Sequence, residues 1–203
     1  DGSKPPLVLA HGFSDNGMCW LPVARDLEAE YDVILPDARG HGKSARLHPG
    51  ESIDGAADLA GLMQALGLRQ AVVGGHSMGG LVVTLLAARN PELVRALVLE
   101  DPAWFTPAPE AEKAPPRQNP FKDWLLSLEG KSLEELMAKC RESDPGWPEV
   151  ELLPWAEAKQ QLDKTIFETE NMTRRDWREL VKEFKCPALL VTAEKDKGAI
   201  ITE

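Results

Sequence analysis

Ser77 stands between two glycines, Gly75 and Gly79, directly after an apolar run and directly before a helix-length apolar segment. A serine hydroxyl becomes a good nucleophile only beside a base that removes its proton and donors that stabilise the oxyanion formed on a carbonyl. Small residues on both sides allow a strained strand-to-helix turn that holds the hydroxyl above the edge of a sheet. The pattern therefore predicts nucleophilic acyl transfer. The alternative is a glycine-rich turn without chemistry.

The elements that would position Ser77 can be read from hydrophobicity. Near-continuous apolar runs without polar alternation are typical of parallel strands that are covered on both faces. Longer segments between them have helical length, and the segment after Ser77 is apolar nearly all round, as in a central buried helix. The fold class is therefore α/β. The expected strands are 7–10, 33–36, 71–74, 93–100 and 188–192, and the expected helices are 16–30, 52–66 and 78–89.

After residue 102 the composition changes, because prolines interrupt the rhythm of strands and helices. Ser132 and Glu135 have the spacing of a capping box at a helix start. We expect a core at 1–103, an inserted helical segment at 104–183 and a return to the core at 184–203. Helices are expected in the inserted segment at about 121–129, 132–142, 149–163 and 173–184.

Composition excludes several classes of function. The formal net charge is −10 and no stripe of Lys and Arg is present, which argues against a nucleic-acid partner. The three cysteines have no paired spacing, so neither a disulfide framework nor a zinc site is expected, and reduced thiols in the cytoplasm are the default. No apolar run has the length of a signal peptide or a membrane span. We therefore expect a cytoplasmic protein without a membrane or nucleic-acid partner.

The run 75–80, Gly-His-Ser-Met-Gly-Gly, closely resembles the nucleophile turn of the α/β-hydrolase family, and the capped lipase- and esterase-like members are the most similar. Residues 9–13 resemble the strand and oxyanion loop of that family, and 36–44 resemble a turn after the next strand. The resemblance covers essentially the whole chain. It implies a mostly parallel sheet with helices on both faces, a helical cap at 104–183, and an oxyanion hole made by the backbone N–H groups of Phe13 and Met78.

The polar residues around these motifs are expected to have mainly structural roles. His11 in the oxyanion loop more often braces such a turn than contacts a substrate. Asp37, Arg39 and His41 are flanked by glycines, which favours a tight turn whose side chains satisfy backbone groups over an acid–base cluster. His48 carries no signal.

The resemblance also implies an acid that orients a catalytic histidine. Asp196, in the loop after the strand at 188–192, stands where the acid of the family usually falls. Glu194 is one alternative. Asp101 is another, because some members carry the acid at the end of the preceding strand.

The expected base is missing from the chain. All four histidines lie at or before the nucleophile (His11, His41, His48 and His76), whereas the family places its catalytic histidine after the acid. His76 is expected to point away from the Ser77 hydroxyl. The expectation is therefore a sequence truncated at both ends. These 203 residues alone should be nearly inactive, because loss of one triad member removes most of the rate.

The preferred function is hydrolysis of an ester-type bond through an acyl-enzyme, with Ser77 as nucleophile and Asp196 as acid. Trp104 and Phe105 could line an apolar acyl pocket, so the substrate is expected to be small and partly hydrophobic. For any single tryptophan, packing of the cap helices on the core is the more frequent role, and this applies to Trp104, Trp124, Trp147, Trp155 and Trp177. No metal or organic cofactor is implied. The same constellation leaves open thioesterase, lactonase, peptidase, carbon–carbon bond hydrolase and perhydrolase chemistry. A hydrolase-like binding protein without turnover is the alternative from another class.

Overall fold

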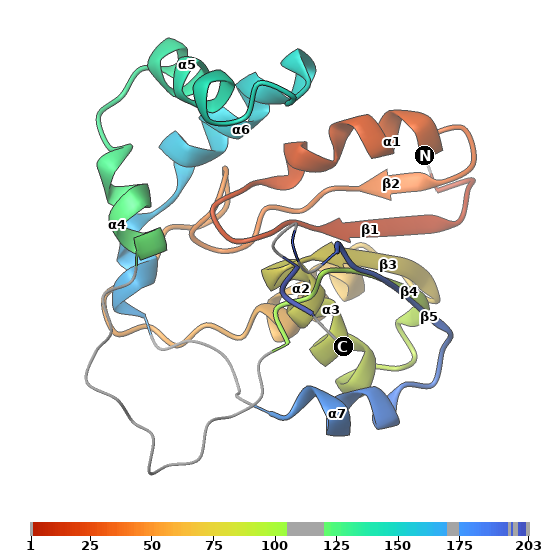
Figure 1. Ribbon diagram of the computed structural model, residues 1–203. Helices are drawn as coiled ribbons and strands as arrows, with labels where there is room; N and C mark the ends of the chain where they lie inside the picture. The colour runs from red at the N-terminus through yellow and green to blue at the C-terminus, as the bar shows by residue number, and fades with distance from the viewer. Residues whose placement is uncertain (1, 105–119, 170–174, 195, 197–198, 202–203) are drawn as a thin grey trace.

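The computed structural model describes residues 2–104, 120–169, 175–194, 196 and 199–201 of the chain. Its centre is a five-stranded sheet with the strand order β2-β1-β3-β4-β5, and all four pairings are parallel (Figure 1). This arrangement confirms the α/β class and every expected strand. The strands are β1 (Pro6–Ala10), β2 (Asp32–Ile34), β3 (Ala71–His76), β4 (Val94–Glu100) and β5 (Ala188–Val191).

Helices lie on both sides of the sheet. In the view of Figure 1, α1 is above the strands, and α3 and α7 are below them. The helix after Ser77 has the expected bounds, and its buried residues surround it on most sides, as its apolar composition requires. The elements that flank the sheet are η1 (Gly17–Trp20), α1 (Leu21–Leu27), α2 (Gly55–Ala65), α3 (Met78–Arg89), α7 (Trp177–Leu180) and η4 (Val181–Glu183).

Two expected helices begin later than their hydrophobic pattern indicated. The segment expected as one helix over 16–30 is a 3-10 turn followed by α1, because Pro22 has no N–H with which to continue a helical ladder. The helix expected from residue 52 begins at 55. Asp54 is its N-cap, and the carboxylate accepts a hydrogen bond from the N–H of Ala57 at 3.1 Å.

A helical segment packs beside the sheet. It consists of α4 (Pro120–Ser127), α5 (Leu133–Ser143), α6 (Glu149–Gln161) and the 3-10 helix η3 (Lys164–Glu168), and we refer to residues 120–168 by this name. The predicted capping box is present, since Ser132 Oγ accepts from Glu135 N and the Glu135 carboxylate accepts from Ser132 N. Of the last expected helix, 173–184, only α7 and η4 are helical, and 173–174 lie outside the described residues.

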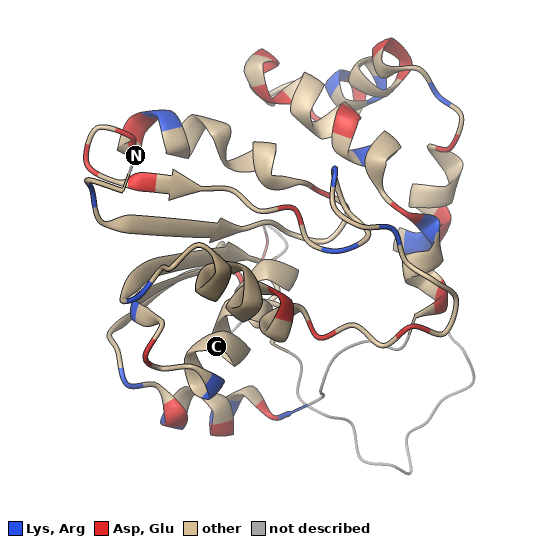
Figure 2. Cartoon of the chain, turned by 180° about the vertical axis from the view of Figure 1, so that it is seen from behind, with Lys and Arg blue, Asp and Glu red and all other residues tan. Residues whose placement is uncertain are grey.

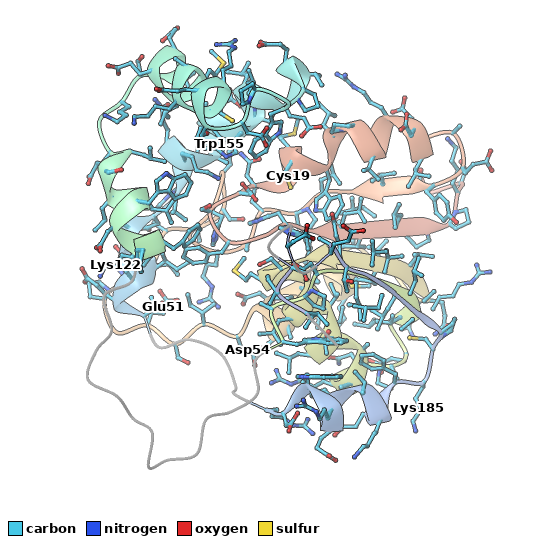
Figure 3. All side chains as sticks on the ribbon, viewed as in Figure 1. Cys19, Glu51, Asp54, Lys122, Trp155 and Lys185 are labelled. Carbon is cyan, nitrogen blue, oxygen red and sulfur yellow. The ribbon has the colours of Figure 1, made fainter. Side chains whose placement is uncertain are left out.

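Two main hydrophobic clusters hold these parts together. One lies between the sheet, α2 and α3, and Trp177, Val181 and Phe184 pack against it. The other joins the helical segment to Leu47, and Phe13 and Trp155 pack against that second cluster. Trp155 is labelled in Figure 3. Its ring centroid lies 6.4 Å from that of Trp124 and 6.2 Å from that of Trp147. The helical segment therefore has a hydrophobic centre of its own, whereas α7 packs on the core of the sheet.

The surface carries both signs of charge, and Figure 2 shows Lys and Arg interspersed with Asp and Glu. All three cysteines are free thiols. Within the described part of the chain, no helix combines the length and the apolar character needed to cross a membrane.

Candidate active site

Ser77 occupies the junction between β3 and α3 in a conformation that non-glycine residues rarely adopt. Its φ is 50° and its ψ is −114°. Its N–H donates to the carbonyl of Glu100 at 3.0 Å, and its own carbonyl accepts from the N–H groups of Leu81 at 3.1 Å and Ala103 at 2.9 Å. Such strain persists only where the surroundings impose it. The sharp strand-to-helix turn predicted around Ser77 is therefore present, and three backbone hydrogen bonds hold it.

The glycines of this turn are required by close backbone approach. A Cβ on Gly75 would lie 2.5 Å from the carbonyl carbon of Gly79. A Cβ on Gly79 would lie 2.6 Å from the carbonyl carbon of Ala10 and from the carbonyl oxygen of His11. Real Cβ contacts are never this short. The first turn of α3 is thus pressed against the end of β1, which brings Met78 to the same end of the sheet as the loop after β1. We refer to this loop as the oxyanion loop because residues 9–13 resemble that loop of the family.

The oxyanion loop follows β1 and contains Phe13. Its path includes a second strained residue, Ser14, at φ 69°. The N–H of Asp15 donates to the carbonyl of Gly12 at 3.2 Å and closes a tight turn. The Phe13 ring lies 5.9 Å, centroid to centroid, from the rings of both Phe121 and Phe167. The loop that carries one proposed oxyanion donor is therefore in contact with the helical segment.

Two buried histidines stiffen the loops on either side of Phe13. His11 Nε2 accepts from the N–H of Ala38 at 2.9 Å, so Nδ1 carries the proton and donates to the carbonyl of Gly12 at 2.8 Å. His41 Nδ1 donates to the carbonyl of Arg39 at 3.1 Å. Burial lowers the pKa of His11, and burial together with the nearby His11 lowers the pKa of His41 to about 4. Both rings are neutral near pH 7 and brace backbone, as expected for His11.

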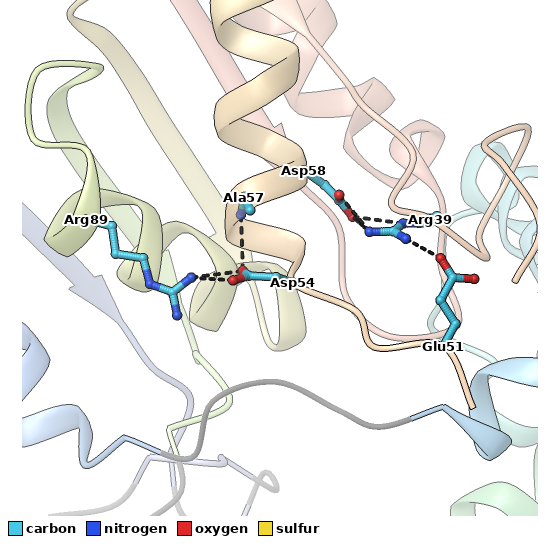
Figure 4. Close-up of polar contacts among 6 residues, drawn as sticks. All are labelled: Arg39, Glu51, Asp54, Ala57, Asp58 and Arg89. Atoms are coloured by element: carbon cyan, nitrogen blue, oxygen red, sulfur yellow. Dashed lines mark hydrogen bonds and ion pairs between the residues drawn. The ribbon is translucent and has the colours of Figure 1, made fainter. Parts of the chain in front are cut away.

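The polar residues of the turn at 37–44 also stabilise the local structure, through hydrogen bonds to backbone groups and ion pairs. The Asp37 carboxylate accepts from the N–H groups of Gly17 and Lys43, each at 2.8 Å. Figure 4 shows Arg39 between Asp58 of α2 and Glu51, and both carboxylates pair with its guanidinium. These contacts tie the turn to its neighbours, so the structural interpretation of Asp37, Arg39 and His41 holds.

A cavity of about 1090 Å³ opens beside Ser77. Met78 and Phe13 line the cavity together with Ser77, so the candidate nucleophile and the residues of both proposed oxyanion donors border one space. Aromatic side chains from the sheet core and from the helical segment form much of its wall: Phe13, Trp104, Phe121, Phe167 and Trp177. Polar groups at the wall include Arg39, Asp58, Lys122 and Arg175.

Trp104 forms part of this wall, as its position in the sequence predicted, but it is also a core residue. It is buried, its Nε1 donates to Thr84 Oγ1 at 2.9 Å, and its ring stacks on that of Trp177 at 4.9 Å. Phe105, the other expected pocket residue, lies outside the described residues.

None of the four histidines forms a hydrogen bond to Ser77 Oγ within the described residues. His11 and His41 are engaged with backbone groups, and His48 is exposed. His76 lies against the oxyanion loop instead, because a Cβ on Gly12 would come within 2.7 Å of its Nδ1. None of the four histidines is therefore placed as a base on the candidate nucleophile in the described structure.

The three candidate acids have different surroundings. Asp196 and Glu194 follow β5 and are exposed. Asp101, at the end of β4, has a φ of 38°, and its carboxylate accepts from the N–H groups of Ile200 at 2.8 Å and Ile201 at 3.0 Å. Asp101 therefore anchors the segment at 200–201, whereas Asp196 forms no hydrogen bond with any described residue.

The sequence did not identify Lys159 of α6 as a residue of this region. Its Nζ reaches the oxyanion loop and bonds to Ser14 and Asp15. A signal existed, because Leu152, Ala156 and Lys159 follow the i, i+4, i+7 spacing of one buried helix face. A lysine on a buried helix face indicates a cation that needs buried partners. The spacing could not identify these partners, because Asp15 and Ser14 precede Lys159 by 144 and 145 residues in the sequence.

No group of three or more potential metal-ligating side chains occurs among the residues described.

A parallel α/β sheet with a strained serine at a strand-to-helix junction defines the class of α/β hydrolases. The family model for the alpha/beta hydrolase fold matches residues 5–129. The chain belongs to this family.

Several individual proteins are similar to the chain. Lipase 1 of Psychrobacter immobilis is 31% identical over 95% of the chain and 62% of its own length. The 2-(acetamidomethylene)succinate hydrolase of Mesorhizobium japonicum is 38% identical over 55% of the chain and 39% of its own length. The chain thus spans less than two thirds of the length of these relatives.

Solved structures agree on the fold. A hypothetical protein from Pseudomonas aeruginosa PAO1 aligns with a TM-score of 0.72 at 27% identity, over 96% of the chain and 75% of that structure. A thermophilic esterase from Thermogutta terrifontis aligns with a TM-score of 0.61 at 29% identity, over 93% of the chain and 71% of that structure.

Proposed function

We propose that the protein is a serine hydrolase that cleaves an ester-type bond of a small, partly hydrophobic substrate through an acyl-enzyme. The observation that carries this proposal is the strained Ser77, with φ 50°, at the wall of a cavity that Phe13 and Met78 also line. Strain of this kind has a cost of order 1–3 kcal/mol and is concentrated at functional sites. A turn without chemistry would have no need to retain it.

In the proposed reaction Ser77 Oγ attacks the substrate carbonyl, and the negative charge that develops on the carbonyl oxygen is received by two backbone N–H donors, those of Phe13 and Met78. Met78 is the first residue of α3, so the positive end of the helix dipole adds to its donor. A base takes the serine proton, and Asp196 orients that base. The tetrahedral intermediate then collapses, and the alcohol leaves with the proton that the base took from Ser77. Water, deprotonated by the same base, attacks the acyl-enzyme, and the carboxylic acid is released as Ser77 regains its proton.

The base in this proposal is a histidine that the 203 residues do not supply, since none of the four present bonds to Ser77 Oγ among the described residues. Activity is therefore assigned to the whole protein. The chain by itself is proposed to be nearly inactive.

The substrate class follows from the wall of the cavity. The aromatic rings of Phe13, Phe121 and Phe167 favour an apolar acyl or alcohol group. The charge of Arg39 at the wall is offset by Asp58 and Glu51, so this guanidinium is not free to hold a substrate carboxylate. The ester class is also that of the lipase and the esterase to which the chain is similar.

The test is hydrolysis of p-nitrophenyl esters of increasing acyl length by the whole protein and by two serine variants. Ser77→Ala is expected to lower kcat by about 10⁶-fold, as removal of a triad nucleophile does. Ser127→Ala, which removes an exposed hydroxyl of α4, serves as the matched control and should leave kcat unchanged. Full activity of Ser77→Ala would overturn the proposal. If the protein instead cleaves a matched amide or carbon–carbon substrate and no ester, the proposed ester substrate class is wrong. The assignment of Ser77 as the nucleophile would still stand.

A further inference from the structure

Lys159 is a buried cation at the contact between the helical segment and the oxyanion loop. Its side chain is 3% exposed. The ammonium group has three acceptors, namely the Ser14 carbonyl at 2.9 Å, Ser14 Oγ at 3.1 Å and Asp15 Oδ1 at 2.8 Å. An ammonium group has three N–H donors, so every donor has a partner. A buried lysine with this full set of contacts is a specific arrangement, because desolvating an unpaired ammonium would be very costly.

The partners of Lys159, Ser14 and Asp15, belong to the tight turn that contains Phe13. Ser14 follows Phe13 directly and has a φ of 69°, a conformation that serine does not favour without support. Lys159 bonds to both the carbonyl and the hydroxyl of this strained residue. The turn between Gly12 and Asp15 encloses Phe13 and Ser14. The Phe13 N–H belongs to the Gly12–Phe13 peptide inside this turn, so loss of the Ser14 conformation would distort the turn and displace that N–H.

A second contact from the same end of α6 supports the loop. Asn16, which is buried, donates from Nδ2 to Gln161 Oε1 at 2.9 Å. Its own Oδ1 accepts from the N–H of Met18 at 3.0 Å, so Asn16 caps η1 at the same time. Lys159 and Gln161 thus hold the two ends of the stretch 14–16, and the loop depends on α6 for its shape.

We infer that Lys159 is a positioning residue for the oxyanion hole, which it maintains by holding Ser14 and Asp15 so that the Phe13 N–H faces the cavity. The inference rests on the proposed function, because it assigns Phe13 as an oxyanion donor. It adds that the helical segment does more than cover the site. One of its side chains determines the geometry of a donor that acts in the transition state.

The test compares Lys159→Met with Lys139→Met in the whole protein. Lys139 is an exposed lysine of α5 in the same helical segment, so its replacement controls for loss of a positive charge. Removal of one oxyanion donor typically lowers kcat by about 10²- to 10³-fold, and a misdirected donor should lose part of that. Lys159→Met is therefore expected to lower kcat by about 10- to 100-fold, with KM changed by less than about threefold because a transition-state contact is lost. Lys139→Met should match the wild type.

A second readout separates positioning from general destabilisation. Phenylboronic acid forms a tetrahedral adduct with a nucleophilic serine and uses the same donors, so its inhibition constant should rise by about the same factor as kcat falls. If Lys159→Met does not fold, as judged by circular dichroism, Asp15→Asn tests the same contact with the lysine retained. It should lower kcat by a smaller factor.

Unchanged kcat in both variants, or an increase in KM alone, would overturn the role of Lys159. A parallel measurement on Ser77→Ala identifies failure of the proposed function itself. If wild-type turnover does not depend on Ser77, the assignment of the Phe13 N–H as an oxyanion donor is wrong. The role inferred for Lys159 is then wrong as well.

Discussion

The ends of β3 and β5 carry the candidate nucleophile and the candidate acid, and the structure holds these two ends very differently. β3 is an interior strand, and the residues after it are fixed by backbone hydrogen bonds to Glu100, Ala103 and Leu81. Among the described strands, β5 lies at one edge of the sheet, all four of its residues are exposed, and Asp196 beyond it is exposed as well. The part of the site that would stabilise the oxyanion is therefore built into the packed core. The candidate acid, in contrast, lies at one edge of the sheet that the described residues form.

The largest expected effect tests which strand end supplies the acid. Asp196→Asn in the whole protein should lower kcat by about 10⁴-fold, the effect of neutralising a triad acid. Asp101→Asn should change kcat by less than about tenfold, because that carboxylate is used by the N–H groups of Ile200 and Ile201. Steady-state kinetics of both variants give the comparison. A large loss in Asp101→Asn alone would move the acid to the end of β4.

The next effect concerns the packed end of β3. Gly79→Ala should destabilise the fold by about 3 kcal/mol, because the added methyl group would collide with the backbone of Ala10 and His11. Gly61→Ala, on the exposed face of α2 with nothing within 4 Å, is the matched control and should stabilise the protein by up to about 1 kcal/mol. Urea denaturation measures both. Equal stabilities would show that the turn around Ser77 is not tightly packed.

Acid should weaken the same core through its buried histidines. The pKa of His41 is about 4 in the folded protein because burial, with the nearby His11, disfavours its charged form, whereas the ordinary value is 6.5. Below pH 6.5 the His41 ring is protonated in the unfolded chain but stays neutral in the folded chain until the pH approaches 4. The free energy of unfolding therefore decreases as the pH falls from 6.5 toward 4. By linkage, protonation of this ring lowers the free energy of unfolding by up to about 3 kcal/mol. Above pH 6.5 the contribution of the neutral ring is fully present.

This dependence is measured by urea denaturation at pH 7 and pH 4.5. His41→Gln should flatten the pH profile of the free energy of unfolding. His48→Gln, at an exposed histidine, should leave the profile as it is. A profile unaltered in His41→Gln would contradict the assignment of a buried neutral ring.

The smallest effect is expected at the start of α2. Asp54 caps this helix through the N–H of Ala57 and pairs with Arg89 of α3 (Figure 4). Asp54→Ala should lower the free energy of unfolding by about 1 kcal/mol through loss of the cap. Asp54→Asn keeps a capping oxygen and loses mainly an exposed ion pair, so its cost should be a few tenths of a kcal/mol. If Asp54→Asn lowered the free energy of unfolding more than Asp54→Ala does, the ion pair with Arg89 would be the main source of stability, and not the helix cap.

The sequence predicted the strands and α3 correctly, because their apolar runs are continuous and local. It also predicted the strained turn at Ser77, because glycine is needed where α3 presses against β1. The break between η1 and α1 was missed although Pro22 was visible, since the apolar spacing over 16–30 favoured one helix. Chain-local patterns thus located the nucleophile side of the site.

Contacts between distant segments could not be predicted in the same way. The bond from Lys159 to Ser14 and the stacking of Trp104 on Trp177 join residues from separate parts of the chain, and no local pattern names the partner. The role of Asp101 as an anchor for residues 200–201 is of the same kind. Asp196 was placed only by family resemblance, and its role stays a prediction.

The most direct test of the central claim is labelling of the folded whole protein with a fluorophosphonate, followed by peptide mass spectrometry. A fluorophosphonate reacts with an activated serine whose adduct is stabilised by an oxyanion hole. We expect one adduct per molecule, on Ser77, that excess ester substrate slows and Ser77→Ala abolishes. A folded protein that hydrolyses esters while Ser77 stays unlabelled, or that takes up the label on another residue, would contradict the account.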